Sequence, residues 1–309
     1  MRKVFGIGET ILDLIFKNDK PYAAVPGGST FNAMVALARL NVPVSFISEL
    51  ATDHIGDLII HFMEENHIAT HYIDRFPDGK TPVSLAFLNE QNDALYSFYH
   101  DFPKERLELP LPDINENDIL VFGSYYALNP VLRPKILEIL KYAKERKAII
   151  YYDLNFRKAH ADEAIFLTPT ALENLELADI VRGSDEDFAN LFRDDDIAHL
   201  YSEHIQYHCD RFICTHGGKG IDLYQGGENE HYEVQQIQPV STIGAGDNFN
   251  AGIIYGMLQE NILREDLNDI SFDQWGRIIR HGINLATETC KTNENYIPKE
   301  FAQQYVSQS

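Results

Sequence analysis

A glycine-rich turn followed directly by an aspartate is the segment of this 309-residue chain best suited to chemistry. Ser241-Thr242-Ile243-Gly244-Ala245-Gly246-Asp247 precedes an apolar-periodic run from Phe249 to Leu258, which predicts a helix. Small residues at such a turn leave the N–H groups of a helix N-terminus free to bind an anion. A carboxylate beside an anion site is suited to accepting a proton from an attacking hydroxyl. The turn and the carboxylate together suggest phosphoryl transfer to an alcohol. Taken alone, however, Gly-Ala-Gly-Asp is more often an ordinary capped helix start, and the rest of the chain shifts the balance.

Composition limits the partners. The formal net charge of −21 argues against nucleic acid or an anionic membrane surface. No apolar window approaches the length of a membrane span, and Glu9 and Asp13 interrupt the apolar run Val4–Phe16, so we expect no signal peptide. The three cysteines show no Cys-x-x-Cys spacing and predict reduced thiols. These features predict a cytoplasmic protein.

Strands and helices alternate along most of the chain, which predicts an α/β fold with a largely parallel sheet covered on both faces. The exception lies between about residues 71 and 100, where two β-rich runs flank the polar turn Asn89–Asp93 and predict a hairpin. With the segment Ile15–Val25 this hairpin would form a small antiparallel sheet, placed to act as a lid. The strands expected in the body are Lys3–Ile7, Val44–Ser48, Ile119–Gly123, Ala148–Asp153, Ile180–Arg182, Arg211–Thr215 and Gly220–Tyr224, and the last two helices are expected at Ala245–Glu260 and Phe272–Lys291.

Polar clusters follow three of the expected strands. Asp153-Leu154-Asn155-Phe156-Arg157 follows one, Thr215-His216-Gly217-Gly218 follows another, and Ser124 follows a third. Ligands of open α/β sheets bind beyond the carboxyl ends of the strands. We therefore expect a shared binding edge there.

At this point the sequence resembles the ribokinase-like, or PfkB-type, carbohydrate kinases over nearly its whole length. Gly27-Gly28-Ser29-Thr30-Phe31-Asn32-Ala33 with Ala36–Leu40 is similar to the N-terminal signature of the family, and Ser241–Asp247 to its C-terminal signature. Asp153-x-Asn155-x-Arg157 and Thr215-x-Gly217 lie between them in the family order. The resemblance implies one kinase domain over residues 1–309. Its fold would be a three-layer α/β/α body with a mostly parallel central sheet and a small antiparallel β lid from about residues 15–25 and 70–102.

The resemblance also implies the chemistry. Asp247 would be the general base, and the N–H groups of Gly244, Ala245 and Gly246 would form the anion hole for the γ-phosphoryl group of ATP, with Mg²⁺ on the phosphates. The acceptor would be a sugar hydroxymethyl group. Tyr96-Ser97-Phe98-Tyr99 is most similar to fructokinases, while ribose, ketodeoxygluconate and nucleoside kinases share the scaffold and stay open as alternatives.

The resemblance also implies binding roles for individual residues. The sugar residues implied are Asp13, Gly27, Gly28, Asn32, Phe98 and Arg157; the nucleotide residues are Thr215, Gly217 and, near adenine, Asn284. Asn32 is otherwise awkward in an apolar helix, and Arg157 offers a planar fork for phosphate or sugar oxygens.

Two family positions are changed. The aspartate that in several members helps to hold a monovalent cation is Ser241 here, so a potassium requirement does not carry over. The Asn-x-x-Glu motif linked to magnesium is Ser184-Asp185-Glu186-Asp187, in which Glu186 or Asp187 would act through water.

The outer face of the lid could also pair two subunits, because a small exposed sheet on its own is prone to pair with other strands.

Three other functions were weighed. A nicotinamide-dependent oxidoreductase is suggested by Gly6-x-Gly8, but the third glycine is missing. A sugar-binding regulatory protein without turnover is suggested by the changes at Ser241 and Ser184. Histidine pairs such as His67/His71 and His204/His208 suggest a metal hydrolase, although neither pair has the glutamate of His-Glu-x-x-His.

Overall fold

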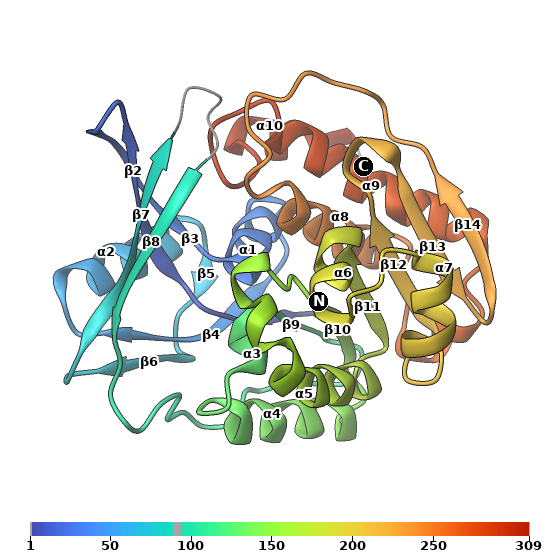
Figure 1. Ribbon diagram of the computed structural model, residues 1–309, viewed down its shortest axis with the longest axis horizontal. Coiled ribbons are helices and arrows are strands. Elements are labelled where there is room, and N and C mark those ends of the chain that lie inside the picture. Colours follow the sequence, from blue (N-terminus) through green and yellow to red (C-terminus); the bar gives the residue numbers. More distant parts are fainter. Residues whose placement is uncertain (1, 89–93, 309) are drawn as a thin grey trace.

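The computed structural model describes residues 2–88 and 94–308, so the predicted turn at 89–93 lies outside the described residues. Its large sheet has the order β14-β13-β12-β11-β10-β9-β1-β4-β5, and β6 pairs with β4 (Figure 1). The pairs from β12 to β5 and β6 are parallel, and the last two strands add antiparallel pairs at one edge. The strands are β1 Val4–Ile7, β4 Val44–Ala51, β5 Ile68–Ala69, β6 Ile73–Phe76, β9 Ile119–Gly123, β10 Ile149–Asp153, β11 Ile180–Ser184, β12 Arg211–Thr215, β13 Ile221–Gln225 and β14 Glu228–Tyr232. The expected mostly parallel sheet is confirmed.

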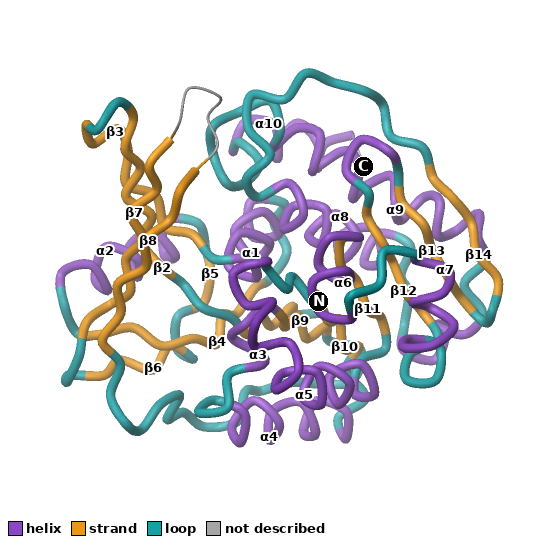
Figure 2. Tube along the Cα trace, in the orientation of Figure 1, coloured by secondary structure: helices purple, strands orange, loops and turns teal. Residues whose placement is uncertain are grey.

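Helices cover both faces of this sheet (Figure 2), because side chains along each buried strand point alternately to opposite faces. On one side Val4 joins a core with α1, α2, α8 and α9; on the other Phe5 joins a core with α4 to α7. The α-helices are α1 Ser29–Arg39, α2 His54–Glu65, α3 Ser124–Leu128, α4 Arg133–Glu145, α5 Ala164–Leu177, α6 Asp185–Phe192, α7 Ile197–Leu200, α8 Ala245–Gln259, α9 Phe272–Thr289 and α10 Lys299–Gln308. Short 3-10 or π turns lie at η1 Lys158–Glu163, η2 Tyr201–Ile205, η3 Gly217–Lys219 and η4 Arg264–Asn268. The three-layer α/β/α body is confirmed.

The second sheet is the expected lid, and it stands at one end of the body (Figure 1). It has the order β3-β2-β7-β8, with β2 Ile11–Lys17, β3 Lys20–Gly27, β7 Lys80–Leu88 and β8 Ala94–Asp101. Each hairpin is antiparallel, as expected. The hairpins meet through their first strands, β2 and β7, and this central pair is parallel, unlike the wholly antiparallel sheet that was expected.

Over residues 2–88 and 94–308, no helix combines the length and the apolar character needed to cross a membrane.

Candidate active site

Asp247 lies where the N-termini of two helices meet. It is in the first turn of α8, and Ser29 and Asn32 belong to α1. One Asp247 oxygen accepts from the Ser29 hydroxyl at 2.9 Å, and the other accepts from the Asn32 amide at 2.8 Å. The two signatures, more than 200 residues apart in the chain, therefore form one site.

The environment of Asp247 suits a base. Its side chain is buried, and burial raises its pKa from 3.8 to about 6, with the charge of Asp153 acting in the same direction. The Asn32 and Ser29 hydrogen bonds and the charge of Arg157 oppose the shift. At neutral pH the carboxylate is ionised, and its pKa is close enough to the ambient pH for efficient proton acceptance.

Asn32 has a second polar atom at this junction. While its amide nitrogen donates to Asp247, its Oδ1 is buried and accepts no hydrogen bond from any described residue. A buried carbonyl oxygen without a partner is costly unless a ligand or water donates to it. Asn32 therefore offers an acceptor beside the carboxylate for a hydroxyl group.

The turn before α8 has a backbone that requires glycine. Gly244 has φ +76°, and a Cβ at this position would lie 2.1 Å from the Asn295 carbonyl oxygen. Ser241 Oγ accepts from the Ile243 N–H at 3.2 Å and so closes the start of the turn. Ala245 and Gly246 follow at the N-terminus of α8, where an anion binds favourably, although the Ala245 N–H donates to the Thr242 carbonyl at 3.2 Å.

A buried arginine, which the sequence analysis missed, lies under this turn. Arg182 of β11 donates to Asp153 at 3.1 Å and to the Thr215 hydroxyl at 2.8 Å. A Cβ on Gly246 would lie 3.1 Å from both terminal guanidinium nitrogens, so the cation packs directly against the glycine. Asp153 also accepts from Asn250 of α8 at 2.9 Å. A fixed positive charge beneath the anion turn strengthens its attraction for phosphate.

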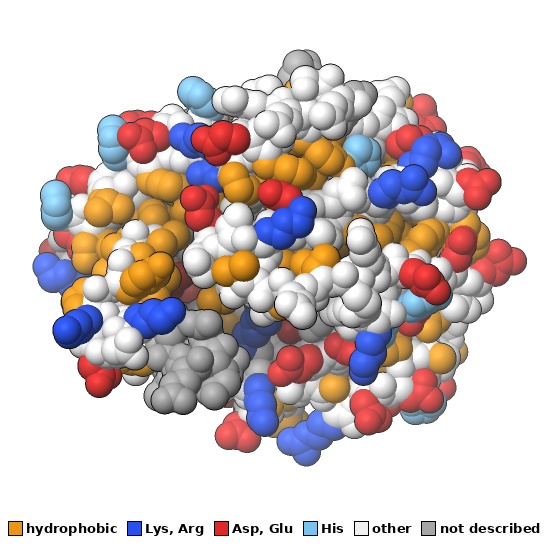
Figure 3. All heavy atoms as spheres, turned by 90° about the horizontal axis from the view of Figure 1, so that it is seen from above, with side chains coloured by type: hydrophobic (Ala, Val, Ile, Leu, Met, Phe, Trp, Pro, Cys, Tyr) orange, Lys and Arg blue, Asp and Glu red, His pale blue; other side chains and the backbone are white. Residues whose placement is uncertain are grey.

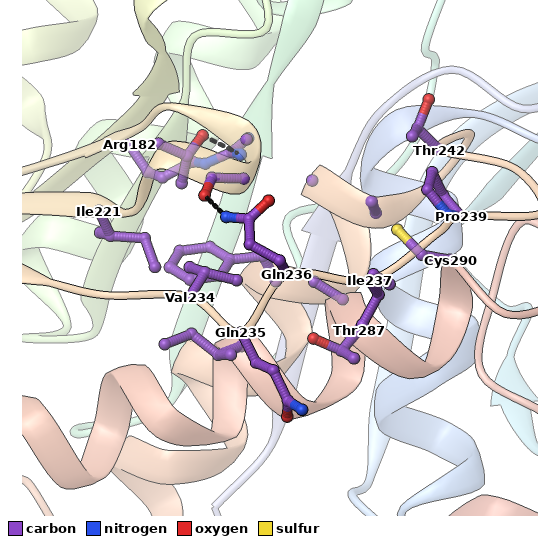
Figure 4. Close-up of a pocket in the computed structure, with 18 residues that line it drawn as sticks. Arg182, Ile221, Val234, Gln235, Gln236, Ile237, Pro239, Thr242, Thr287 and Cys290 are labelled. Atoms are coloured by element: carbon purple, nitrogen blue, oxygen red, sulfur yellow. Dashed lines mark hydrogen bonds between the residues drawn. The ribbon is translucent and has the colours of Figure 1, made fainter.

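A cavity of about 310 Å³ opens beside the turn (Figure 4). Thr215, Gly217, Gly218 and Arg182 line one part. The start of α8, the loop 234–239, α9 and Ile221 line the rest. Two predicted nucleotide residues, Thr215 and Gly217, thus lie in its wall.

Asn284 does not line this cavity. The lining residues of α9 are Ile283, Ala286, Thr287 and Cys290, whereas the Asn284 amide donates to the Tyr305 hydroxyl at 3.1 Å. The prediction of an adenine contact from Asn284 has no support in this geometry, because its side chain is directed to α10.

The lid places two of the predicted sugar residues, Asp13 and Phe98, in one row across its strands. Asp13 of β2 is in register with Ser84 of β7, which is in register with Phe98 of β8. The Ser84 hydroxyl donates to Asp13, and burial raises the pKa of that carboxyl. A Cβ on Gly27 would lie 2.5 Å from Asp13 Oδ2, so a side chain at this position would displace the Asp13 carboxylate. Phe98 is 62% exposed on the lid.

Gly28 and Arg157 complete the predicted sugar set. Gly28 has φ +137°, and a Cβ there would lie 2.2 Å from the Glu9 carbonyl oxygen. Arg157 is exposed after β10, near enough to Asp247 to lower its pKa.

The residues named for magnesium have different surroundings. Glu186 is exposed, whereas Asp187 is buried and accepts from both the backbone N–H and the hydroxyl of Ser184 in a capping box. Among residues 2–88 and 94–308, no group of three or more His, Cys, Asp or Glu side chains is arranged to hold a metal ion. A metal here would depend on oxygens brought by a substrate, as Mg²⁺ commonly does on phosphates.

Known proteins resemble this chain over most of its length. The model of the pfkB family of carbohydrate kinases matches residues 1–269. A fructokinase from Vibrio alginolyticus is 23% identical over 257 residues, 82% of this chain and 83% of that protein. A 5-dehydro-2-deoxygluconokinase from Geobacillus thermodenitrificans is 27% identical over 248 residues, 75% of this chain and 72% of that protein. The crystal structure of a fructokinase from Vibrio cholerae O395, with fructose, ADP and calcium bound, has a TM-score of 0.85 at 19% identity, over 99% of both chains.

Fold and site thus define a class, the ATP-dependent kinases whose phosphoryl acceptor is a sugar hydroxyl. The chain belongs to the pfkB family of carbohydrate kinases.

Proposed function

We propose that this kinase transfers the γ-phosphoryl group of MgATP to a hydroxymethyl group of fructose. The observation that carries the acceptor site is the Asp247–Asn32 pair, in which a base and a free acceptor oxygen face the same junction. Fructose as the sugar is supported by the fructokinases among the relatives. Asp13, in register with Ser84 and Phe98, supplies a carboxylate for sugar hydroxyls below an aromatic ring.

In this proposal Asp247 accepts the proton as the sugar oxygen attacks the γ-phosphorus, and general base catalysis of this kind contributes ~10²–10⁴-fold. The amides of Gly244, Ala245 and Gly246 receive the charge that develops on the transferred group, and Arg182 supports them from below. Closure of the lid over the sugar would exclude water, which otherwise competes as acceptor.

ATP is proposed to occupy the cavity beside Thr215 and Gly217, with its phosphates toward the N-terminus of α8. Magnesium would neutralise the phosphate oxygens, and Glu186 and Asp187 would face it through water. Because Ser241 closes the turn as a neutral residue, we propose that turnover does not need potassium.

Two copies are proposed to pair through the lid. The residues that alternate with Asp13 and Ser84 along their strands point to the opposite face of the sheet, where the rings of Phe16 and Phe87 stack with centroids 4.9 Å apart. Hydrophobic side chains gather at the lid end of the molecule in Figure 3. A second lid would cover this apolar face.

A cytoplasmic location is a further proposal, supported by three free cysteines, of which Cys209 and Cys214 are buried.

The test is ADP release from MgATP with fructose, ribose, ketodeoxygluconate, tagatose and a nucleoside, each with and without potassium. We expect the highest kcat/KM for fructose and the same rate in both salts. A higher kcat/KM for another member of the panel would overturn fructose as the substrate and leave the kinase assignment in place.

A further inference from the structure

His216 bridges two carboxylates at the edge of the nucleotide cavity. Its Nδ1 lies 3.1 Å from Asp185 Oδ2, and its Nε2 lies 3.0 Å from Asp222 Oδ2. The two aspartates belong to different elements, the first turn of α6 and strand β13. Only 13% of the His216 side chain is exposed, so water does not readily replace either partner.

This geometry places a carboxylate acceptor at each nitrogen of the ring. A neutral imidazole carries one N–H, so its other nitrogen would direct a lone pair at a carboxylate oxygen. With a carboxylate at each nitrogen, both contacts are hydrogen bonds only when both ring nitrogens carry a proton. The two charge-assisted hydrogen bonds are about twice as strong as neutral ones.

Asp222 is itself held in place. Its second oxygen accepts from His231 Nδ1 at 2.6 Å, and His231 is its directly opposed partner on β14. The ring of His231 also packs against Gly220, where a Cβ would lie 2.5 Å from Nε2. The chain Asp185–His216–Asp222–His231 therefore connects α6 to the antiparallel edge of the sheet.

The residues next to His216 line the cavity proposed for ATP. Thr215 precedes it, and Gly217 and Gly218 follow it. The backbone N–H of His216 donates to the Gly220 carbonyl at 2.9 Å, and the backbone N–H of Lys219 donates to the His216 carbonyl at 3.1 Å, so His216 is part of the hydrogen-bonded turn. Figure 4 shows the far side of this turn, where Gln236 donates to the Gly218 carbonyl from the loop across the cavity.

We propose that His216 is a positioning residue for the nucleotide, acting as a charged clamp that fixes the 215–218 turn against α6 and β13. It touches no reacting atom. Its effect passes along the backbone to its neighbours Thr215, whose hydroxyl accepts from Arg182, and Gly217, which both line the cavity proposed for the nucleotide. The proposal rests on the nucleotide site proposed above.

The kinetic test compares His216→Gln and Asp185→Asn with the wild-type protein. Each variant keeps the size of the side chain and removes one half of the clamp. Loss of such positioning should raise KM for ATP roughly three- to tenfold, because the hydrogen bonds removed are charge-assisted but remote from the chemistry. The kcat and the KM for the sugar should stay within about twofold, since neither residue contacts the reacting atoms.

The control is His208→Gln, which removes another histidine–carboxylate pair, His208 with Glu176 at 3.1 Å, away from the cavity. It should leave KM for ATP unchanged. Equal effects of His208→Gln and His216→Gln on KM would overturn the proposal, and so would an unchanged KM in His216→Gln. Absence of ATP turnover in the wild-type protein would instead refute the proposed function.

A spectroscopic test uses the wild-type protein and so does not depend on whether a variant folds. In protein labelled with ¹⁵N-histidine, the two ring nitrogens of His216 should both show the shifts of protonated nitrogens at neutral pH. One protonated and one unprotonated nitrogen would contradict the clamp.

Discussion

Replacing Asp247 with asparagine should stabilise the protein at neutral pH while it removes turnover. The carboxylate is buried at the junction of α1 and α8, where an ionised group loses its hydration. Asparagine is neutral and has the same shape. Its carbonyl can accept from the Asn32 amide and its NH₂ group can donate to the Ser29 hydroxyl, so both hydrogen bonds to this position are retained.

The magnitude follows from the pKa. Burial raises the pKa of Asp247 from 3.8 to about 6, and each pKa unit corresponds to about 1.4 kcal/mol. The ionised carboxylate therefore costs the native state about 3 kcal/mol at neutral pH. The pKa of Asp247 is higher in the native state than in the unfolded state. The loss of stability therefore develops as the pH rises from about 4 to about 6, and it is complete above about pH 6.

The assay is urea unfolding at 25 °C at intervals from pH 4 to pH 8, with the wild-type protein and Asp247→Asn side by side. The free energy of unfolding should be nearly equal at pH 4, and the variant should be more stable by about 1–3 kcal/mol at pH 7. Asp273→Asn is the matched control, because Asp273 is an exposed aspartate in the first turn of α9. It should show no such gain.

A variant that is less stable than the wild-type protein at pH 7 would refute the reasoning, as would a gain that does not change with pH. The activity must move in the opposite direction. Without the base, kcat should fall ~10²–10⁴-fold.

Four further results are expected. In the wild-type protein, kcat/KM for the sugar should fall about tenfold per pH unit below about pH 6, because protonated Asp247 cannot act as base; a flat profile down to pH 5 would argue against it. Arg182→Leu should lower the free energy of unfolding by about 3–5 kcal/mol, since Asp153 stays buried without its cation, and urea unfolding measures this. Gly244→Ala should abolish turnover under MgATP saturation, because its Cβ would meet the Asn295 carbonyl oxygen. Rates with sodium and potassium should agree within about twofold, and a large potassium activation would show that Ser241 does not remove cation dependence.

Local patterns predicted the parts of the site whose residues are close in sequence. The Gly-Ala-Gly turn and Asp247 form one helix start, and Gly27 and Gly28 precede another. Their meeting could be inferred only from the family resemblance, since no local signal pairs Asn32 with Asp247. Arg182 was missed for a related reason. Its partners Asp153 and Thr215 are about 30 residues away on either side, on neighbouring strands.

Two further differences between the predicted and the observed structure concern Asn284 and strand β14. The lining residues Ile283, Ala286, Thr287 and Cys290 share one face of α9 centred near Ile283, and Asn284 lies about 100° round the helix from Ile283. Its side chain is therefore directed away, toward Tyr305. Strand β14 was missed because its polar residues show no alternation of apolar and polar side chains.

The most direct test of the account follows the phosphoryl group itself. Fructose and MgATP are incubated with the wild-type protein and with Asp247→Asn, and ³¹P NMR identifies the products. The account predicts a sugar phosphate monoester and ADP in equal amounts with the wild-type protein, and neither at a comparable rate with the variant. Equal rates in both proteins, or inorganic phosphate in place of a sugar phosphate, would contradict it.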